Sequence, residues 1–195
     1  MSSQQPGQSS DLKVPSTAPA VRSDACCSGL GWIGAVVVVV LYALDQATKL
    51  WTVRNFELGE RKIVFGTWFE WVHFSNTGAA FGIMQDSNRF FIGLSAVAAI
   101  AIGVFLKKNL FPGKLNFAAL ILLLAGIFGN VTDRFLHGYV VDFLLFDFGF
   151  PPFNPWPAFN VADSCICVSV GLLLLVSFQE DVERRAALKR GQEDR

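Results

Sequence analysis

Four long apolar runs, separated by shorter polar stretches, dominate the pattern of the chain. They cover about residues 30–51, 89–106, 115–130 and 160–178. An α-helix rises about 1.5 Å per residue, so about 20 apolar residues cross the roughly 30 Å hydrocarbon layer of a membrane. The pattern therefore predicts four transmembrane helices.

The segment between the first two runs follows a different pattern. Two short runs rich in β-branched and aromatic residues, 62–65 and 67–74, meet at Gly66, which is typical of two strands joined by a turn. We therefore predict an α-helical membrane protein with a small extramembrane β-sheet at about residues 55–84. A second loop is expected at about residues 135–158. Its part at 146–157 is rich in aromatic residues and proline, and we expect that part to lie at the membrane surface and to close over an acyl chain.

The two ends of the chain are more polar than the region between them. Residues 1–28 are rich in Ser, Gln, Pro and Ala, which predicts a disordered tail, and residues 181–195 form a basic tail. Residues 29–180 then form one membrane domain. Lys and Arg concentrate in the cytoplasmic loops of membrane proteins, so we expect both tails and the basic loop at 107–114 to be cytoplasmic.

Composition narrows the class of protein further. Hydrophobic residues make up 52% of the 195 positions and charged residues 16%, which is typical of a membrane protein rather than a soluble domain. The formal net charge is zero, and without a basic patch we expect no nucleic-acid partner. The four cysteines, at 26, 27, 165 and 167, lack the spacing of a metal site, so we expect no metal and no cofactor.

The unusual polar residues fall on one side of the predicted membrane. If the N-terminus is cytoplasmic, they all lie at the outer ends of the helices or in the outer loops. An Asp at a membrane helix centre costs about 2.5–3.5 kcal/mol, so such a concentration indicates a functional site. The residues are Asp45, Lys49, Asn76, Asn130, Asp133, Arg134, Asp142, Asn160 and Asp163.

Asp142 and Asp163 are the candidate catalytic pair. Two neighbouring carboxyl groups share one proton readily, so that one acts as an acid and the other as a base, a division suited to hydrolysis by water. Asp163 follows Asn160 by three residues at a helix start, where free amides and the helix dipole favour the ionised form. We therefore expect Asp142 to hold the proton. The alternative is that each Asp caps a helix or pairs with an Arg.

Helical spacing suggests partners for the other polar residues. Asp45 and Lys49, at i and i+4, share one helical face and favour an ion pair. Asn130 and Arg134 are also one turn apart, so both are expected to point at a peptide backbone or a lipid headgroup. Asp133 faces a neighbouring direction and is expected to tie the end of the third helix to a loop.

Five short blocks occur in order along the chain. They are Asp45-Gln46-x-x-Lys49, Asn76-x-Gly78-Ala79-Ala80-Phe81, Gly129-Asn130-x-x-Asp133-Arg134, Val140-Val141-Asp142-Phe143 and Phe159-Asn160-x-Ala162-Asp163-Ser164. In order and spacing the blocks resemble those of bacterial lipoprotein signal peptidase, the type II signal peptidase. The resemblance covers about residues 31–178. One departure is Ala125, where the family often has Gly before Gly126, and the long N-terminal tail is another.

The resemblance implies a monomeric aspartic endopeptidase of the inner membrane, with its active site and its small β-sheet at the periplasmic face. Such an enzyme contacts membrane lipids and cleaves a prolipoprotein just before its diacylglyceryl-modified cysteine. By the same resemblance, Asp142 and Asp163 are catalytic. Residues that bind substrate or support the site are then Asn76, Gly78, Asn130, Arg134, Asn160, Asp45, Lys49 and Asp133.

Two other classes of protein also use polar groups at a membrane face. A small ion- or proton-coupled transporter subunit would relay protons through paired carboxylates, but it would favour carboxylates near the midplane and an internal repeat, and the sequence shows neither. An assembly protein that binds a partner through its aromatic loops would leave the two carboxylates unexplained.

Overall fold

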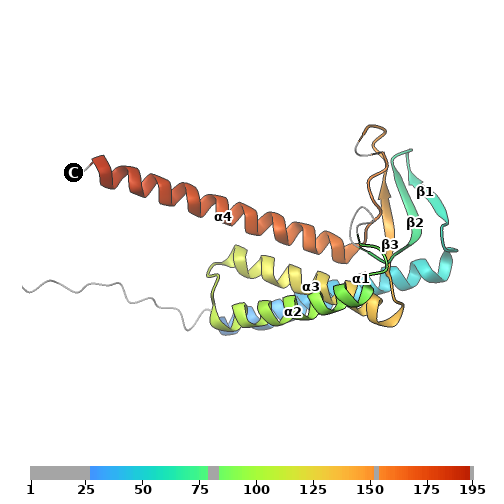
Figure 1. Ribbon diagram of the computed structural model, residues 1–195, viewed down its shortest axis with the longest axis horizontal. Helices are drawn as coiled ribbons and strands as arrows, with labels where there is room; N and C mark the ends of the chain where they lie inside the picture. The colour runs from blue at the N-terminus through green and yellow to red at the C-terminus, as the bar shows by residue number, and fades with distance from the viewer. Residues whose placement is uncertain (1–26, 79–83, 152–153, 194–195) are drawn as a thin grey trace, which may run out of the picture.

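The computed structural model describes residues 27–78, 84–151 and 154–193, and the expected tail at 1–28 lies almost wholly outside these residues. The described chain folds into four helices and one small sheet (Figure 1). The elements are α1 (Cys27–Asn55), β1 (Arg61–Phe65), β2 (Phe69–Asn76), α2 (Asn88–Lys108), α3 (Lys114–Leu136), β3 (Val140–Phe146) and α4 (Val161–Glu193). All four helices are long and apolar enough to cross a membrane, which confirms the four predicted spans.

The three strands form one antiparallel sheet in the order β1-β2-β3. The two predicted strands are present as β1 and β2, and the turn between them begins at Gly66, whose φ of 56° suits glycine. The third strand, β3, was not predicted from the sequence. It lies in the segment expected to be a loop, because a short continuous apolar run fits several structures until its pairing partner, here β2, is known.

Helix α3 is the central helix of the bundle and packs against α1, α2 and α4. Two glycines allow α4 to approach it closely. A Cβ added at Gly126 would lie 2.5 Å from the carbonyl oxygen of Ala162, and one added at Gly129 would lie 2.8 Å from the Cβ of Ala162. Ala125 is buried in the same part of α3. The start of α4 is therefore held against the middle of α3.

The outer faces of the helices carry large apolar side chains, as expected for surfaces that contact lipid. Val39, Val97, Ile100 and Leu174 are each more than half exposed. In a water-soluble protein such a surface would drive association, whereas in a bilayer it is the solvated surface.

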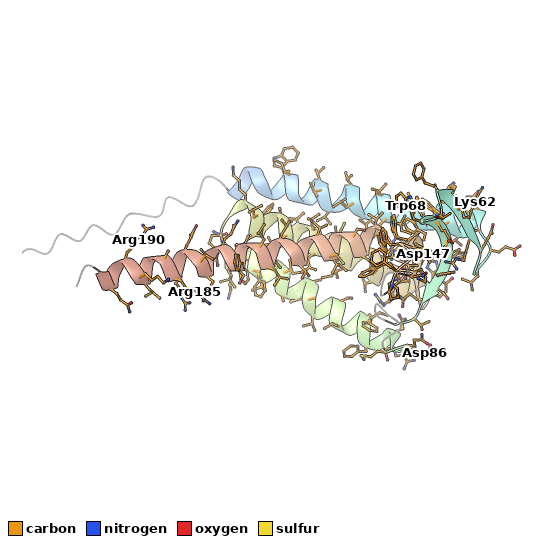
Figure 2. All side chains as sticks on the ribbon, turned by 90° about the horizontal axis from the view of Figure 1, so that it is seen from above. Lys62, Trp68, Asp86, Asp147, Arg185 and Arg190 are labelled. Atoms are coloured by element: carbon orange, nitrogen blue, oxygen red, sulfur yellow. The ribbon has the colours of Figure 1, made fainter. Side chains whose placement is uncertain are left out.

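The sheet stands across the end of the bundle at which α1 ends and α4 begins, with its strands running roughly perpendicular to the helices (Figure 1). Helix α4 continues past its apolar run to Glu193, and Arg185 pairs with Asp181 at 2.7 Å on that extension. Arg185 and Arg190 therefore lie at the opposite end of the molecule from Trp68 and Asp147 (Figure 2). The fold thus separates a basic end from an end that carries the sheet.

Candidate active site

Two asparagines hold the carboxyl group of Asp142, which lies near the start of β3. Its Oδ1 accepts a hydrogen bond from Nδ2 of Asn160 at 2.8 Å, and its Oδ2 accepts one from Nδ2 of Asn76 at 3.0 Å. Burial raises the pKa of Asp142 to about 7, and the nearby Asp163 carboxylate adds to the rise, while the two amide hydrogen bonds and Lys49 oppose it. Asp142 is therefore able to carry a proton near neutral pH.

Asp163 lies in the first turn of α4, and Asn160 caps that helix. Oδ1 of Asn160 accepts the backbone N–H of Asp163 at 2.9 Å, while Oδ2 of Asp163 accepts the backbone N–H of Asn160 at 3.3 Å. The two residues thus satisfy each other's free amides, as in a capping box. Nδ2 of Asn130 donates to Oδ1 of Asp163 at 2.7 Å.

Asn160 therefore contacts both members of the candidate pair, with Nδ2 on Asp142 and its backbone N–H on Asp163. Because one residue bridges the two carboxyl groups, they lie side by side although they are far apart in sequence. The structure brings Asp142 and Asp163 together at the junction of β3 and α4.

A buried cluster of charged and polar side chains lies beneath the pair. The ammonium of Lys49 lies 2.8 Å from Oδ2 of Asp45, 3.0 Å from Oδ2 of Asp133 and 3.1 Å from Oδ1 of Asn130. An ammonium has three N–H donors, so these three oxygens satisfy it completely. Gln46 donates to Asp45 at 3.2 Å and to Asp133 at 3.1 Å. The predicted Asp45–Lys49 pair is part of this larger cluster.

The same two carboxylates also fix the backbone of the elements that carry the catalytic candidates. Oδ1 of Asp45 accepts the backbone N–H of Ala162 at 2.8 Å, at the start of α4. Oδ2 of Asp133 accepts the backbone N–H of Val141 at 3.0 Å, one residue before Asp142. Asp133 thus ties α3 to the following segment, as its position suggested, although that segment is a strand.

Arg134 reaches the end of β2 and lies close enough to Asp142 and Asp163 to interact with both electrostatically. Its Nη2 donates to the carbonyl oxygen of Gly78 at 3.0 Å, and the guanidinium carbon lies 4.9 Å from the ring centroid of Phe91. The Nε of Arg134 is buried and has no hydrogen-bond partner among the described residues. The N–H of Gly78 is held in turn by Oδ1 of Asn76 at 3.0 Å. Asn130 and Arg134, although one turn apart, therefore serve different parts of the site.

Two parts of this arrangement were not among the sequence candidates. Gln46 was part of a quoted block, yet only the fold shows it between Asp45 and Asp133. Asn88, at the start of α2, donates to the carbonyl oxygen of Arg134 at 2.9 Å, and no sequence signal marks it. Of the quoted blocks, residues 79–81 lie outside the described residues.

The histidines take no part in the carboxyl site. His73 lies in β2, with Nδ1 2.9 Å from the carbonyl oxygen of Phe56, and His137 follows the end of α3. Within the three described stretches of the chain, no group of three or more His, Cys, Asp or Glu side chains is placed to hold a metal ion.

Comparison with known proteins gives one consistent family. A family model described as signal peptidase (SPase) II matches residues 37–179, a range that contains every site residue named above. The lipoprotein signal peptidase of Psychromonas ingrahamii is 37% identical over 155 residues, which cover 77% of this chain and 86% of that protein. The lipoprotein signal peptidase of Ralstonia nicotianae is 42% identical over 152 residues, which cover 75% and 84% of the two chains.

Solved structures agree with these sequence matches. A bacterial membrane enzyme determined at 2.3 Å resolution superposes with a TM-score of 0.71 at 28% identity, covering 76% of this chain and 89% of its own. A second such enzyme, at 1.9 Å resolution, has a TM-score of 0.66 at 30% identity, covering 74% and 91%. The similarity thus extends over nearly the whole length of both solved chains.

Proposed function

Because this chain belongs to the signal peptidase II family, we propose that Asp142 and Asp163 are the catalytic pair of an aspartic endopeptidase. The protein is a multi-pass inner-membrane protease that removes the signal peptide from lipoprotein precursors. The transporter alternative from the sequence is therefore wrong. The substrate bond is the peptide bond just before the diacylglyceryl-modified cysteine of the precursor.

One observation carries the catalytic assignment: Asn160 holds a carboxyl oxygen of Asp142 and a carboxyl oxygen of Asp163 at the same time. Two buried carboxyl groups held this close share a proton, since both cannot be ionised comfortably. The raised pKa of Asp142, about 7, supports Asp142 as the member that is protonated at neutral pH. Asp163 accepts hydrogen bonds at the N-terminus of α4, where a negative charge is stabilised.

These roles define a reaction. Asp163 takes a proton from a water molecule, whose oxygen attacks the carbonyl carbon of the scissile bond, while Asp142 gives its proton to the carbonyl oxygen. The resulting tetrahedral diol collapses as Asp163 passes its proton to the leaving nitrogen and Asp142 recovers a proton from a hydroxyl group. The carbon–nitrogen bond breaks, and the pair returns to its starting protonation.

The neighbouring polar residues hold the substrate and the pair in place. Asn76 and Asn130 orient the two carboxyl groups, while Arg134, which also holds the carbonyl oxygen of Gly78, offers its Nε–H to the substrate backbone. The buried Nε of Arg134, which has no partner in the described chain, supports this role. A substrate carbonyl oxygen would satisfy it.

The orientation in the membrane follows from the two ends of the molecule. The basic end, which carries Arg185 and Arg190, is opposite the end with the sheet (Figure 2). By the positive-inside rule both termini are cytoplasmic and the carboxyl pair lies near the periplasmic face. A single chain supplies both carboxyl groups, so a monomer suffices for the chemistry.

The test uses purified protein in detergent and a diacylglyceryl-modified prolipoprotein. Asp142→Asn and Asp163→Asn keep the shape of each side chain and remove its ionisation. We expect both variants to fold, as judged by melting curves. We expect cleavage to fall by at least about three orders of magnitude, because removing one member of a group of residues that act together removes most of its catalytic effect. Asp86→Asn, at an exposed carboxylate outside the site, is the control and should cleave normally. Normal cleavage by either dyad variant would overturn the assignment.

A further inference from the structure

Arg134 is attracted by both carboxyl groups of the proposed catalytic pair without binding either. It interacts electrostatically with Asp163 and Asp142, yet no ion pair joins it to an acidic side chain of the described chain. A guanidinium matches a carboxylate in shape and commonly forms two parallel hydrogen bonds with it. Such a pair would hold a catalytic carboxyl group ionised and would occupy its oxygens. Other contacts therefore keep the guanidinium away from the pair.

Those contacts come from the two ends of the segment that joins β2 to α2. At one end, Nη2 of Arg134 donates to the carbonyl oxygen of Gly78 at 3.0 Å. At the other end, in the first turn of α2, the guanidinium carbon lies over the ring of Phe91, 4.9 Å from its centroid. In the same turn, Nδ2 of Asn88 donates to the carbonyl oxygen of Arg134 at 2.9 Å. Helix α2 thus contacts both the side chain and the backbone of Arg134.

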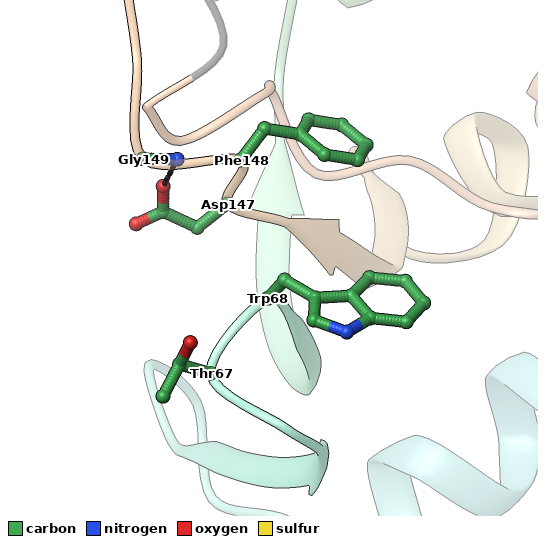
Figure 3. A pocket seen from close by; sticks show the side chains of 5 residues that line it. All are labelled: Thr67, Trp68, Asp147, Phe148 and Gly149. Carbon is green, nitrogen blue, oxygen red and sulfur yellow. Dashed lines mark hydrogen bonds between the residues drawn. The ribbon is translucent and has the colours of Figure 1, made fainter.

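The hollows beside the sheet do not account for the position of Arg134. One hollow, of about 660 Å³, lies between the turn after β1 and the segment after β3, and Figure 3 shows the residues that line it: Thr67, Trp68, Asp147, Phe148 and Gly149. A smaller one, of about 320 Å³, is lined by Phe146, Phe148, Trp156 and Phe159. Arg134 lines neither hollow, so its direct contacts are what fix it.

Phe91 limits the directions in which the guanidinium can move. A cation over the face of an aromatic ring is attracted by the ring quadrupole, and the attraction is stronger where water is excluded. Asn88 fixes the start of α2 against the end of α3, which places Phe91 beside Arg134. With Nη2 on Gly78 and the ring beneath it, Arg134 keeps its buried Nε without a hydrogen-bond partner among the described residues.

The position of Arg134 is also transmitted to Asp142 through a short chain of hydrogen bonds. Gly78, whose carbonyl oxygen Arg134 holds, donates its own N–H to Oδ1 of Asn76 at 3.0 Å. The same Asn76 amide donates from Nδ2 to Oδ2 of Asp142 at 3.0 Å. A displacement of Arg134 would therefore move Gly78, turn the Asn76 amide and disturb the carboxyl group that carries the proton.

We propose that Phe91 is a positioning residue, which holds the Arg134 guanidinium clear of the carboxyl pair and directed at the substrate. This inference rests on the proposed function, in which Arg134 offers its Nε–H to the substrate backbone. Phe91 itself touches neither the substrate nor the carboxyl groups and acts through Arg134. Helix α2, which carries no catalytic group, thereby contributes to catalysis.

The first test replaces the ring and keeps the apolar volume. Phe91→Leu should lower kcat/KM for a diacylglyceryl-modified lipopeptide by about tenfold, because the loss of a cation–π contact shifts the guanidinium between positions by about that factor. Its melting temperature should change little. Phe91→Tyr keeps the ring and should cleave like the wild type. Phe135→Leu, at a position next to Arg134 that is 78% exposed, is the matched control and should also cleave normally.

The pH profile separates positioning from packing. The charged groups near Asp142 and Arg134 are Lys49 of α1, Asp133 of α3 and Asp163 of α4. A guanidinium released toward the pair would stabilise the ionised form of Asp142 and lower its pKa, so the fall of kcat/KM near pH 7 should move to lower pH in Phe91→Leu. A slower Phe91→Leu whose fall stays at the wild-type pH would show a packing defect and overturn the proposal.

A double-mutant cycle tests whether Phe91 acts through Arg134. Arg134→Gln has no charge to be attracted by the pair, so adding Phe91→Leu to it should lower kcat/KM by less than about twofold further. A full tenfold effect in both backgrounds would show that Phe91 acts independently of Arg134. If Arg134→Gln cleaves too slowly to measure, the pH profile of Phe91→Leu decides alone.

Failure of this inference is distinguishable from failure of the proposed function. If Phe91→Leu cleaves like the wild type while Asp142→Asn and Asp163→Asn do not cleave, Phe91 is not a positioning residue and the catalytic pair is unaffected. If either Asp variant cleaves normally, the catalytic assignment fails whatever Phe91 does.

Discussion

Lys49 donates a hydrogen bond to Oδ1 of Asn130 at 3.1 Å, deep inside the bundle. This contact decides which way the Asn130 amide faces, since its oxygen must point at the ammonium and its nitrogen then points at Oδ1 of Asp163, 2.7 Å away. Lys49 thus acts on the proposed catalytic pair in two ways, through its charge and through the orientation of Asn130, to which it donates a hydrogen bond.

Replacing Lys49 should damage both stability and activity. Lys49→Met leaves Asp45 and Asp133 buried without their shared cation, a change that typically costs about 3–5 kcal/mol. We expect a clear fall in the melting temperature and a loss of cleavage. Adding Asp133→Asn to Lys49→Met removes one of the stranded charges and should restore part of the melting temperature but not the activity. A Lys49→Met protein that melts like the wild type would show that the cluster contributes little.

The raised pKa of Asp142 predicts how cleavage depends on pH. Catalysis needs a proton on Asp142, so kcat/KM should fall as the pH rises through about 7. The hydrogen bond from Asn76 lowers this pKa, so Asn76→Ala should move the fall to higher pH as well as reducing the rate. The pH profiles of the two proteins, measured with one lipopeptide, check both parts. A profile of Asn76→Ala that falls at lower pH than the wild type would contradict the assignment.

The same group makes stability depend on pH. The pKa of Asp142 is about 7 in the folded protein, whereas the ordinary pKa of an Asp side chain, 3.8, applies to the unfolded chain. Between these two pH values the folded protein holds a proton that the unfolded chain has lost. This stabilisation is complete below pH 4 and is lost as the pH rises through about 7. Asp142→Asn cannot ionise, so its melting temperature relative to that of the wild type should be higher at pH 8 than at pH 5. Melting curves at the two pH values decide; an unchanged difference would show that Asp142 does not titrate in this range.

The glycines of α3 offer a test of the helix contact that assembles the site. A Cβ at Gly126 would lie 2.5 Å from the carbonyl oxygen of Ala162, so Gly126→Ala should push the start of α4 away from α3. We expect a fall in melting temperature and a drop in cleavage of about tenfold or more, because small displacements of catalytic groups are costly. Gly171→Ala, at a position of α4 with nothing within 4 Å, is the control. If Gly126→Ala and Gly171→Ala have the same melting temperature and the same rate of cleavage, α4 does not approach α3 at Gly126 as closely as the structure shows.

The parts of this molecule that the sequence could predict are those set by short-range periodicity. The four spans follow from runs of apolar residues, and the Asp45–Lys49 pair follows from a spacing of four on one helix. The strand β3 could not be predicted in this way, because its apolar run has no distinctive period and its partner is β2, which precedes it by more than sixty residues. Asn76 and Asp142 meet only because that pairing places them at the same end of the sheet.

Contacts between helices set the remaining part of the site. The hydrogen bond from the backbone N–H of Ala162 to Asp45 joins two helices across 117 positions of sequence. Such a contact depends on how closely α4 approaches α3 at Gly126 and Gly129, and helical spacing within one segment carries no information about it. For the same reason Gln46 showed no sign, in sequence, of lying between two carboxylates.

The ion pair within α1 also has a consequence for biosynthesis. The chain is made from its N-terminus, so α1 enters the bilayer before α3 has been synthesised. Asp133 and Asn130, two of the three final partners of Lys49, do not yet exist at that moment, whereas Asp45 lies one turn away on the same helix. Lys49 of α1 therefore enters the membrane already paired with Asp45. Asp133 and Asn130 contact Lys49 later, when α3 packs against α1.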